Sequence, residues 1–228
     1  INPAFAHAKR PVVLNNWEAT YFDVNEEKLF AIIDEAASLG ADTFVLDDGW
    51  FARRNADNCS LGDWYANLDK FPGGLKGIID KCKSVGLKFG LWLEPEMVSE
   101  DSDLYRAHPD FAIAKRGTEP CRSRNQLVLD LTKREVVDYL VGVISRLLAE
   151  NDISYIKWDK NRDMTELYSD GLTADRQGEF QHRYTLGFYE LADRLTSAFP
   201  DVLFEGCAGG GGRFDGGVLY YFPQIWTS

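Results

Sequence analysis

Short apolar segments alternate with segments of helical periodicity along the chain, and this alternation most constrains the fold. Seven segments are apolar enough to form one buried strand each, at residues 11–17, 43–46, 88–93, 127–131, 153–158, 202–206 and 223–227. Apolar residues recur at the spacing of an α-helix in five others, at residues 26–39, 74–85, 101–107, 133–150 and 177–199. Strands that alternate with helices predict a parallel sheet with right-handed crossover connections.

Local signals fix several boundaries of these elements. Asn25 is a good N-cap for the helix at 26–39, and Gly40 supplies its stop. Gly86 ends the helix at 74–85 in the same way. The connection at residues 51–71 is too long and too polar for a plain link, so we expect a functional loop there.

The ends of the predicted strands decide between an open doubly wound sheet and a closed barrel. An open sheet gathers its ligand groups at one switch point, whereas a barrel collects them from the carboxyl ends of many strands. Here almost every strand ends in a carboxylate, a tryptophan or a cysteine, namely Trp17, Asp47, Asp48, Trp92, Glu94, Asp130, Asp159, Cys207 and Trp226. The sequence therefore predicts a single α/β domain over residues 1–228, a TIM (β/α)8 barrel that is incomplete at its C-terminus because no eighth strand follows.

Charge and composition narrow the class of ligand. The chain has 36 acidic and 25 basic residues, a net charge of −11, which would repel a nucleic-acid backbone. No apolar run is long enough to predict a membrane span. The four cysteines form no CxxC pair, so neither a zinc site nor a disulfide framework is expected, and a reduced, cytoplasmic protein fits. A neutral small molecule is the expected partner.

Carboxylates and tryptophans on one rim, without a histidine or cysteine cluster, favour a sugar ligand. Tryptophan faces pack against the apolar C–H side of a sugar ring, and carboxylates accept hydrogen bonds from neighbouring hydroxyls. A pair of carboxyl groups also supplies the nucleophile and the acid of glycoside hydrolysis.

Five ordered motifs carry a resemblance to a known family. LDDGW at 46–50, WLEPEM at 92–97, YIKWDKNR at 155–162, CAGGGGRFD at 207–215 and PQIWTS at 223–228 together resemble the family 36 glycoside hydrolases. These are α-galactosidases related to raffinose synthases, and the resemblance runs from about residue 12 to 228. It implies a retaining hydrolase of melibiose- and raffinose-type sugars that needs no metal or organic cofactor and is often tetrameric. The family's N-terminal β-sandwich and C-terminal β domain are expected to be absent from this chain.

The resemblance also implies roles for single residues. Asp159 corresponds to the nucleophile, while Lys157, Asn161 and Arg124 hold sugar hydroxyls and orient it. Asp47 and Asp48 correspond to the pair that binds the 4- and 6-hydroxyls of galactose. The implied pocket walls are Trp17, Trp50, Trp92, Cys207 and Gly210.

The acid/base carboxylate of this family directly follows the position of Ser228, so we expect the second catalytic group to lie beyond this sequence. Asp215 is the nearest substitute, but it is more typical of a helix cap or loop anchor.

Several alternatives stay open at this point. A raffinose-synthase-like galactosyltransferase would share the nucleophile, and a chain without its acid/base could be an inert sugar-binding fragment. Asp159 could instead be a rim carboxylate paired with Lys157 or Arg162, and Asp47 and Asp48 could form a turn. Glu94 and Glu96 are either functional or part of a loop packed beneath Trp92.

Overall fold

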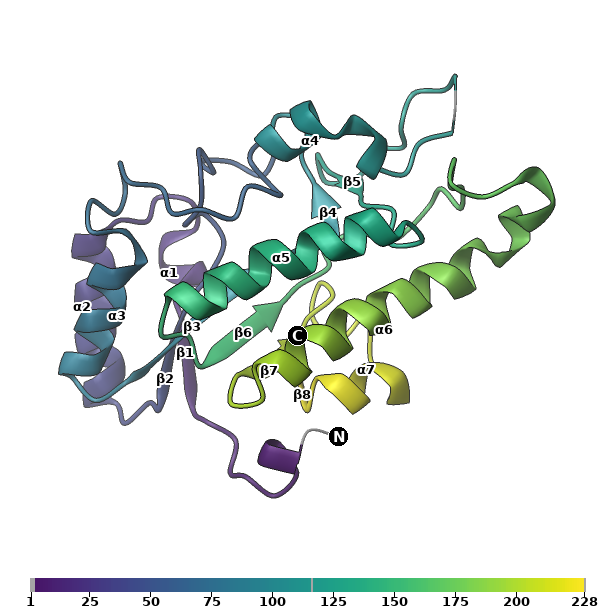
Figure 1. Cartoon of the computed structure of the whole chain (residues 1–228). Coiled ribbons are helices and arrows are strands. Elements are labelled where there is room, and N and C mark those ends of the chain that lie inside the picture. The colour runs from purple at the N-terminus through teal and green to yellow at the C-terminus, as the bar shows by residue number, and fades with distance from the viewer. Residues whose placement is uncertain (1–2, 116, 228) are drawn as a thin grey trace.

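A curled parallel sheet forms the centre of the computed structural model, which describes residues 3–115 and 117–227 (Figure 1). Within these residues the sheet has six strands in the order β1-β2-β3-β6-β7-β8. The strands are β1 Val13–Asn15, β2 Thr43–Leu46, β3 Lys88–Leu93, β6 Tyr155–Trp158, β7 Leu203–Gly206 and β8 Gln224–Ile225. Their order never reverses along the sheet, so it has no switch point of the doubly wound kind. The predicted α/β class is confirmed, with the strands curled into part of a barrel.

One predicted strand lies outside this sheet. Residues 127–131 supply only β5, Leu127–Val128, which pairs antiparallel with β4, Met97–Val98. The backbone amides that follow donate to the neighbouring loops, Leu129 to Glu96 O at 2.8 Å and Asp130 to Phe111 O at 2.7 Å. Because these backbone amides find their acceptors in the loops, the segment does not insert into the sheet. Strand β3 therefore pairs directly with β6. The prediction of a parallel strand at residues 127–131 was wrong, so Asp159 follows the fourth strand of the sheet and not a fifth.

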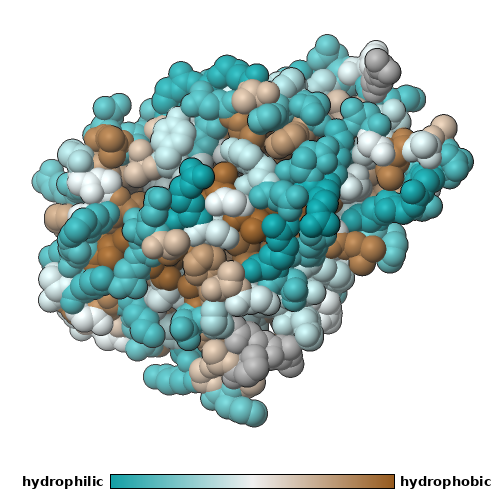
Figure 2. Space-filling model, viewed as in Figure 1, coloured by the Kyte–Doolittle hydropathy of each residue, from teal (hydrophilic) through white to brown (hydrophobic). Residues whose placement is uncertain are grey.

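Helices cover the outer face of the sheet (Figure 1). The α-helices are α1 Trp17–Thr20, α2 Glu26–Ser38, α3 Gly74–Ser84, α4 Asp103–Ala107, α5 Arg134–Glu150, α6 Phe180–Ala198 and α7 Gly216–Tyr221. Of these, α1 and α4 lie beyond the carboxyl ends of the strands and not on the outer face (Figure 1). Short 3₁₀ helices occur at Pro3–Phe5, Pro109–Phe111 and Ala174–Glu179. Helices α5 and α6 cross in front of β6 and β7, and their outward surface is largely hydrophilic (Figure 2). In the described part of the chain, no helix combines the length and the hydrophobicity needed to cross a membrane.

The capping predictions agree with the structure. The Asn25 side chain accepts from the Lys28 amide at 3.0 Å at the start of α2, and Gly40 has a φ of 77° after its end. Helix α6 begins at Phe180, later than predicted. It packs so closely on the chain after β5 that a Cβ on Gly187 would lie 1.9 Å from Leu131 O, so a side chain there would force the two segments apart.

Two hydrophobic clusters lie on opposite faces of the sheet. The large one lies between the sheet and the helices and includes Ile156 and Trp158 of β6. The small one contains Val45 and Tyr155 with Leu203. Because side chains alternate across a strand, the residues two and four beyond Tyr155 share its inner face. Lys157 and Asp159 are therefore stacked above this inner cluster, at the carboxyl end of the sheet.

Candidate active site

Asp159 follows β6 directly and is held by neutral donors. Its Oδ2 accepts from Trp92 Nε1 at 3.1 Å and Asn161 Nδ2 at 2.7 Å. Its Oδ1 accepts from the backbone amides of Lys160 at 2.9 Å and Gly209 at 3.4 Å. The carboxylate is 5% exposed. Within the described residues it forms no ion pair, so the interpretation of a rim carboxylate paired with Lys157 or Arg162 does not hold.

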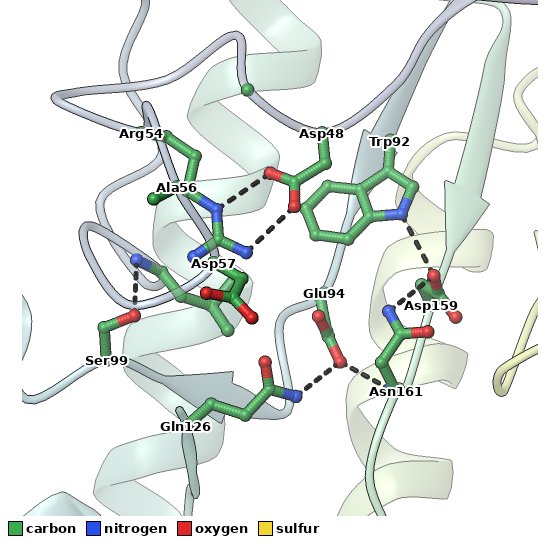
Figure 3. Close-up of polar contacts among 12 residues, drawn as sticks. Asp48, Arg54, Ala56, Asp57, Trp92, Glu94, Ser99, Gln126, Asp159 and Asn161 are labelled. Atoms are coloured by element: carbon green, nitrogen blue, oxygen red, sulfur yellow. Dashed lines mark hydrogen bonds and ion pairs between the residues drawn. The ribbon is translucent and has the colours of Figure 1, made fainter. Parts of the chain in front are cut away.

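Glu94 lies beside Asp159 and shares a partner with it (Figure 3). Its Oε1 accepts from the Asn161 amide at 2.5 Å and from Gln126 Nε2 at 2.8 Å. Burial, and then the charge of Asp159, raises the pKa of Glu94 to about 7. The structure thus places a second carboxyl group with an unusual proton affinity next to the predicted nucleophile.

Asp47, at the end of β2, is held by a buried cation. Lys157 Nζ lies 2.8 Å from Asp47 Oδ2, although the two residues are 110 positions apart. Burial alone would lower the pKa of Lys157, but the Asp47 carboxylate outweighs it and raises that pKa. The ammonium also lies 4.6 Å from the centre of the Trp226 ring, close enough for a cation–π contact.

Asp48 is held by a second buried cation, Arg54 (Figure 3). The guanidinium donates through Nε to Oδ1 at 2.9 Å and through Nη2 to Oδ2 at 2.8 Å, and Arg54 is only 2% exposed. Burial is the largest influence on Asp48 and raises its pKa, with Arg54 acting against it. The backbone amide of Gly49 also donates to this carboxylate, and a carboxylate with these three donors can still accept a further hydrogen bond from a ligand hydroxyl. Gly49 has a φ of 99°, so the predicted turn is also present.

Three tryptophans were predicted to line the pocket, and the structure separates them. Trp92 touches Asp159, as described, and Trp17 is partly exposed at the end of β1. Trp50 is completely buried and donates through Nε1 to Trp92 O at 2.9 Å. Trp92 is itself only 2% exposed, so burial separates Trp17 from the other two, and the role of Trp50 as a pocket wall stays a prediction.

The remaining predicted residues come from two loops, one before β5 and one after β7. Arg124 is exposed and donates to Asn161 O at 3.3 Å. Cys207 and Gly210 are buried in the loop after β7, and burial raises the pKa of Cys207 to about 12. The thiol therefore stays protonated at neutral pH. A cavity of about 190 Å³ opens here, and its lining includes Asn161 and Gly209.

Two other carboxylates have structural roles. Glu96 is fully buried and accepts from Trp158 Nε1 at 3.0 Å and from Tyr184. Burial would raise its pKa, but Arg213, 2.8 Å away, holds it below the usual value. Asp215 accepts from the amides of Gly217 and Val218 and caps α7, which confirms its interpretation as a helix cap.

Arg54 and Gln126 were not predicted from the sequence as site residues. Arg54 lies in the loop predicted to be functional, but its neighbour Arg53 is also an arginine and is exposed. Nothing in the sequence distinguishes the buried arginine from the exposed one. Within residues 3–115 and 117–227, no cluster of three His, Cys, Asp or Glu side chains is placed to hold a metal ion.

Known proteins resemble the chain over its whole length. The family profile described as melibiase matches residues 1–228. Alpha-galactosidase 1 of Pediococcus pentosaceus is 54% identical over 228 residues, which is 100% of this chain and 31% of that protein. Alpha-galactosidase Mel36A of Lactobacillus acidophilus is 55% identical over 96% of this chain and 30% of that protein.

Solved structures give the same result for the fold. The α-galactosidase AgaA of Geobacillus stearothermophilus superposes with a TM-score of 0.96 and 54% identity, over 99% of this chain and 31% of AgaA. A variant of AgaA was solved in complex with raffinose, and it matches with the same TM-score. The chain spans about a third of the length of these relatives.

Proposed function

The chain belongs to the melibiase family, whose profile matches all of its residues, and we propose that the protein containing it is an α-galactosidase. It would remove terminal α-linked galactose from melibiose- and raffinose-type sugars. The names of the relatives support this activity, and the AgaA complex with raffinose supports the substrate class.

The proposal includes the architecture of the whole protein. The parallel strands would be the first part of a TIM (β/α)8 barrel, flanked by the N-terminal β-sandwich and C-terminal β domain that the sequence resemblance implies. A homotetramer and a cytoplasmic location belong to the same proposal. The free state of all four cysteines supports a reducing compartment.

In the proposed mechanism, an Asp159 oxygen attacks the anomeric carbon as the bond to the leaving oxygen breaks. A carboxylic acid gives its proton to that oxygen, and a galactosyl ester of Asp159 forms. Water then attacks the same carbon, the acid/base group takes the water proton, and Asp159 is released as a carboxylate. The acid/base group is expected directly after Ser228, and both positions lie outside the described residues.

Asp47 and Asp48 would set the preference for galactose. Lys157 and Arg54 fix their carboxylates so that the acceptor positions they retain can bind the 4- and 6-hydroxyls. A sugar with the opposite configuration at C4 would leave these buried acceptors unpaired, which a polar site discriminates strongly against. Trp17, Trp50 and Trp92 would form walls around the sugar ring, and Arg124, Asn161, Cys207 and Gly210 would complete the lining of the site.

The observation that carries the proposal is the environment of Asp159. Trp92 and Asn161 orient the carboxylate with neutral donors, while the nearby ammonium of Lys157 bonds to Asp47. The negative charge of Asp159 is therefore not committed to a cation, as a nucleophile requires.

Asp159→Asn in the full-length protein tests the proposal. Turnover of an activated aryl α-galactoside should fall by at least about 10⁴-fold, while galactose binding stays detectable by calorimetry. An unchanged rate would refute the assignment. Product analysis with a competing sugar acceptor would distinguish hydrolysis from galactosyl transfer.

A further inference from the structure

Glu94 connects two loops that meet at the candidate nucleophile. It follows β3 and is 1% exposed. Its Oε1 accepts from Gln126 Nε2 at 2.8 Å, on the chain leading into β5, and from the Asn161 amide at 2.5 Å, on the loop after β6. One carboxyl oxygen therefore fixes the position of the Asn161 backbone.

Asn161 passes this constraint on to Asp159. While its backbone amide donates to Glu94, its side-chain Nδ2 donates to Asp159 Oδ2 at 2.7 Å (Figure 3). A shift of the Asn161 backbone would move the side-chain amide away from that oxygen. We propose that Glu94 is a positioning residue for the nucleophile Asp159 and acts through Asn161. This inference rests on the proposed function.

The charged groups around Glu94 make its protonation state, and therefore its proposed role, depend on pH. Asp159 approaches it from the end of β6, and Arg54 approaches it from the loop after β2. Gln126 and Asn161 are neutral, and the Arg54 guanidinium is hydrogen-bonded to Asp48. Since burial and Asp159 raise the pKa of Glu94 to about 7, Glu94 is protonated below that pH. Above it, a second negative charge lies next to Asp159.

Glu96, two residues further on, shows that burial alone does not produce this behaviour. Glu96 is equally buried, but its partners are Arg213, Trp158 and Tyr184. Arg213 compensates its charge and keeps the pKa of Glu96 low. Of these two carboxyl groups, only Glu94 shares a hydrogen-bond donor residue, Asn161, with Asp159.

Two substitutions in the full-length protein separate positioning from charge. Glu94→Ala removes the acceptor, so Asn161 is released and kcat should fall about 10- to 100-fold. The dissociation constant for galactose should change less than kcat does, since the contacts of Asp47 and Asp48 with the sugar are untouched and Asn161 is only one of the proposed sugar-binding groups. Glu94→Gln keeps an oxygen acceptor for both donors and should retain most of kcat below pH 7.

The pH profile gives a readout that a purely structural role would not move. A dinitrophenyl α-galactoside is suitable, because its leaving group departs without a proton and the acid/base group drops out of the first step. Ionised Glu94 stabilises the positive charge that develops at the anomeric carbon. For wild type, kcat/KM should therefore rise about three- to tenfold through pH 7, and Glu94→Gln should lack this rise.

Asp130→Asn is the matched control. Asp130 is also a buried carboxyl group, and burial raises its pKa, but it accepts from Thr132 in its own turn. This variant should keep the rise through pH 7. A Glu94→Gln profile that retains the rise, or a folded Glu94→Ala with wild-type kcat, would overturn the proposal. Wild-type protein that does not turn over α-galactosides would instead overturn the proposed function.

Discussion

The ends of β2 and β6 both present buried carboxylates to the same site, but the two ends hold them differently. At β2, Asp47 and Asp48 each pair with a buried cation, Lys157 and Arg54. At β6, the bonds to Asp159 come from an indole, a side-chain amide and backbone amides. A cation fixes a carboxylate and neutralises it, whereas neutral donors fix it and leave its charge available.

This difference matches two chemical tasks. Fixed, neutralised acceptors suit the recognition of hydroxyl groups, where position decides specificity. An oriented carboxylate without a cation suits attack on a carbon that becomes positive. The substitutions below test this difference between the two strand ends, in order of decreasing expected effect.

Arg54→Met should have the largest effect. It leaves the Asp48 carboxylate buried without its cation, which costs about 3 to 5 kcal/mol of unfolding free energy. Urea unfolding of the full-length protein would measure the loss, and galactose affinity should fall with it.

Arg53→Met is the matched control for that change. The Arg53 side chain is 67% exposed and pairs with Asp101 at the surface, where ion pairs contribute about 0 to 1 kcal/mol. Equal losses from the two substitutions would contradict a special role for the buried cation at β2.

Trp92→Phe should have an intermediate effect on the β6 side. The ring remains, but Asp159 loses its indole donor, so kcat should fall about 10- to 100-fold with little loss of stability. Trp158→Phe removes the corresponding donor to Glu96. Because Glu96 is outside the nucleophile's network, that variant should lose stability and keep kcat. A larger loss of kcat in Trp158→Phe than in Trp92→Phe would argue that turnover does not depend on the indole donor to Asp159.

Lys70→Met should have the smallest effect. Lys70 Nζ donates to three carbonyls, those of Phe22, Gly49 and Arg54, at 3.0, 2.9 and 2.8 Å. Losing these bonds should cost about 1 to 3 kcal/mol and weaken galactose binding through the Asp48 loop. Lys76→Met, at a lysine that is 80% exposed, should change neither. Wild-type stability of Lys70→Met would mean that the loop is held without this ammonium.

Much of the fold was predictable because its signals are local. The strands at β2, β3, β6 and β7, the Asn25 cap and the end of α2 at Gly40 follow from apolar periodicity and capping residues. The segment at 127–131 misled the prediction, since a short buried apolar run looks the same in a parallel strand and in the small β4–β5 pair. Only its hydrogen-bond partners distinguish the two.

The sequence by itself determined which strand ends carry carboxylates and tryptophans, because strand ends and residue types are local properties. The tertiary structure decided which partners each of these residues has, how deeply it is buried and what charge it carries. Lys157 meets Asp47 from 110 positions away, Arg54 is buried while Arg53 is exposed, and the Trp50 indole donates to the backbone carbonyl of Trp92. The charge state and reach of a carboxylate depend on burial and on the groups within a few ångströms. Those neighbours come together only when the strands pair and the loops close over their ends.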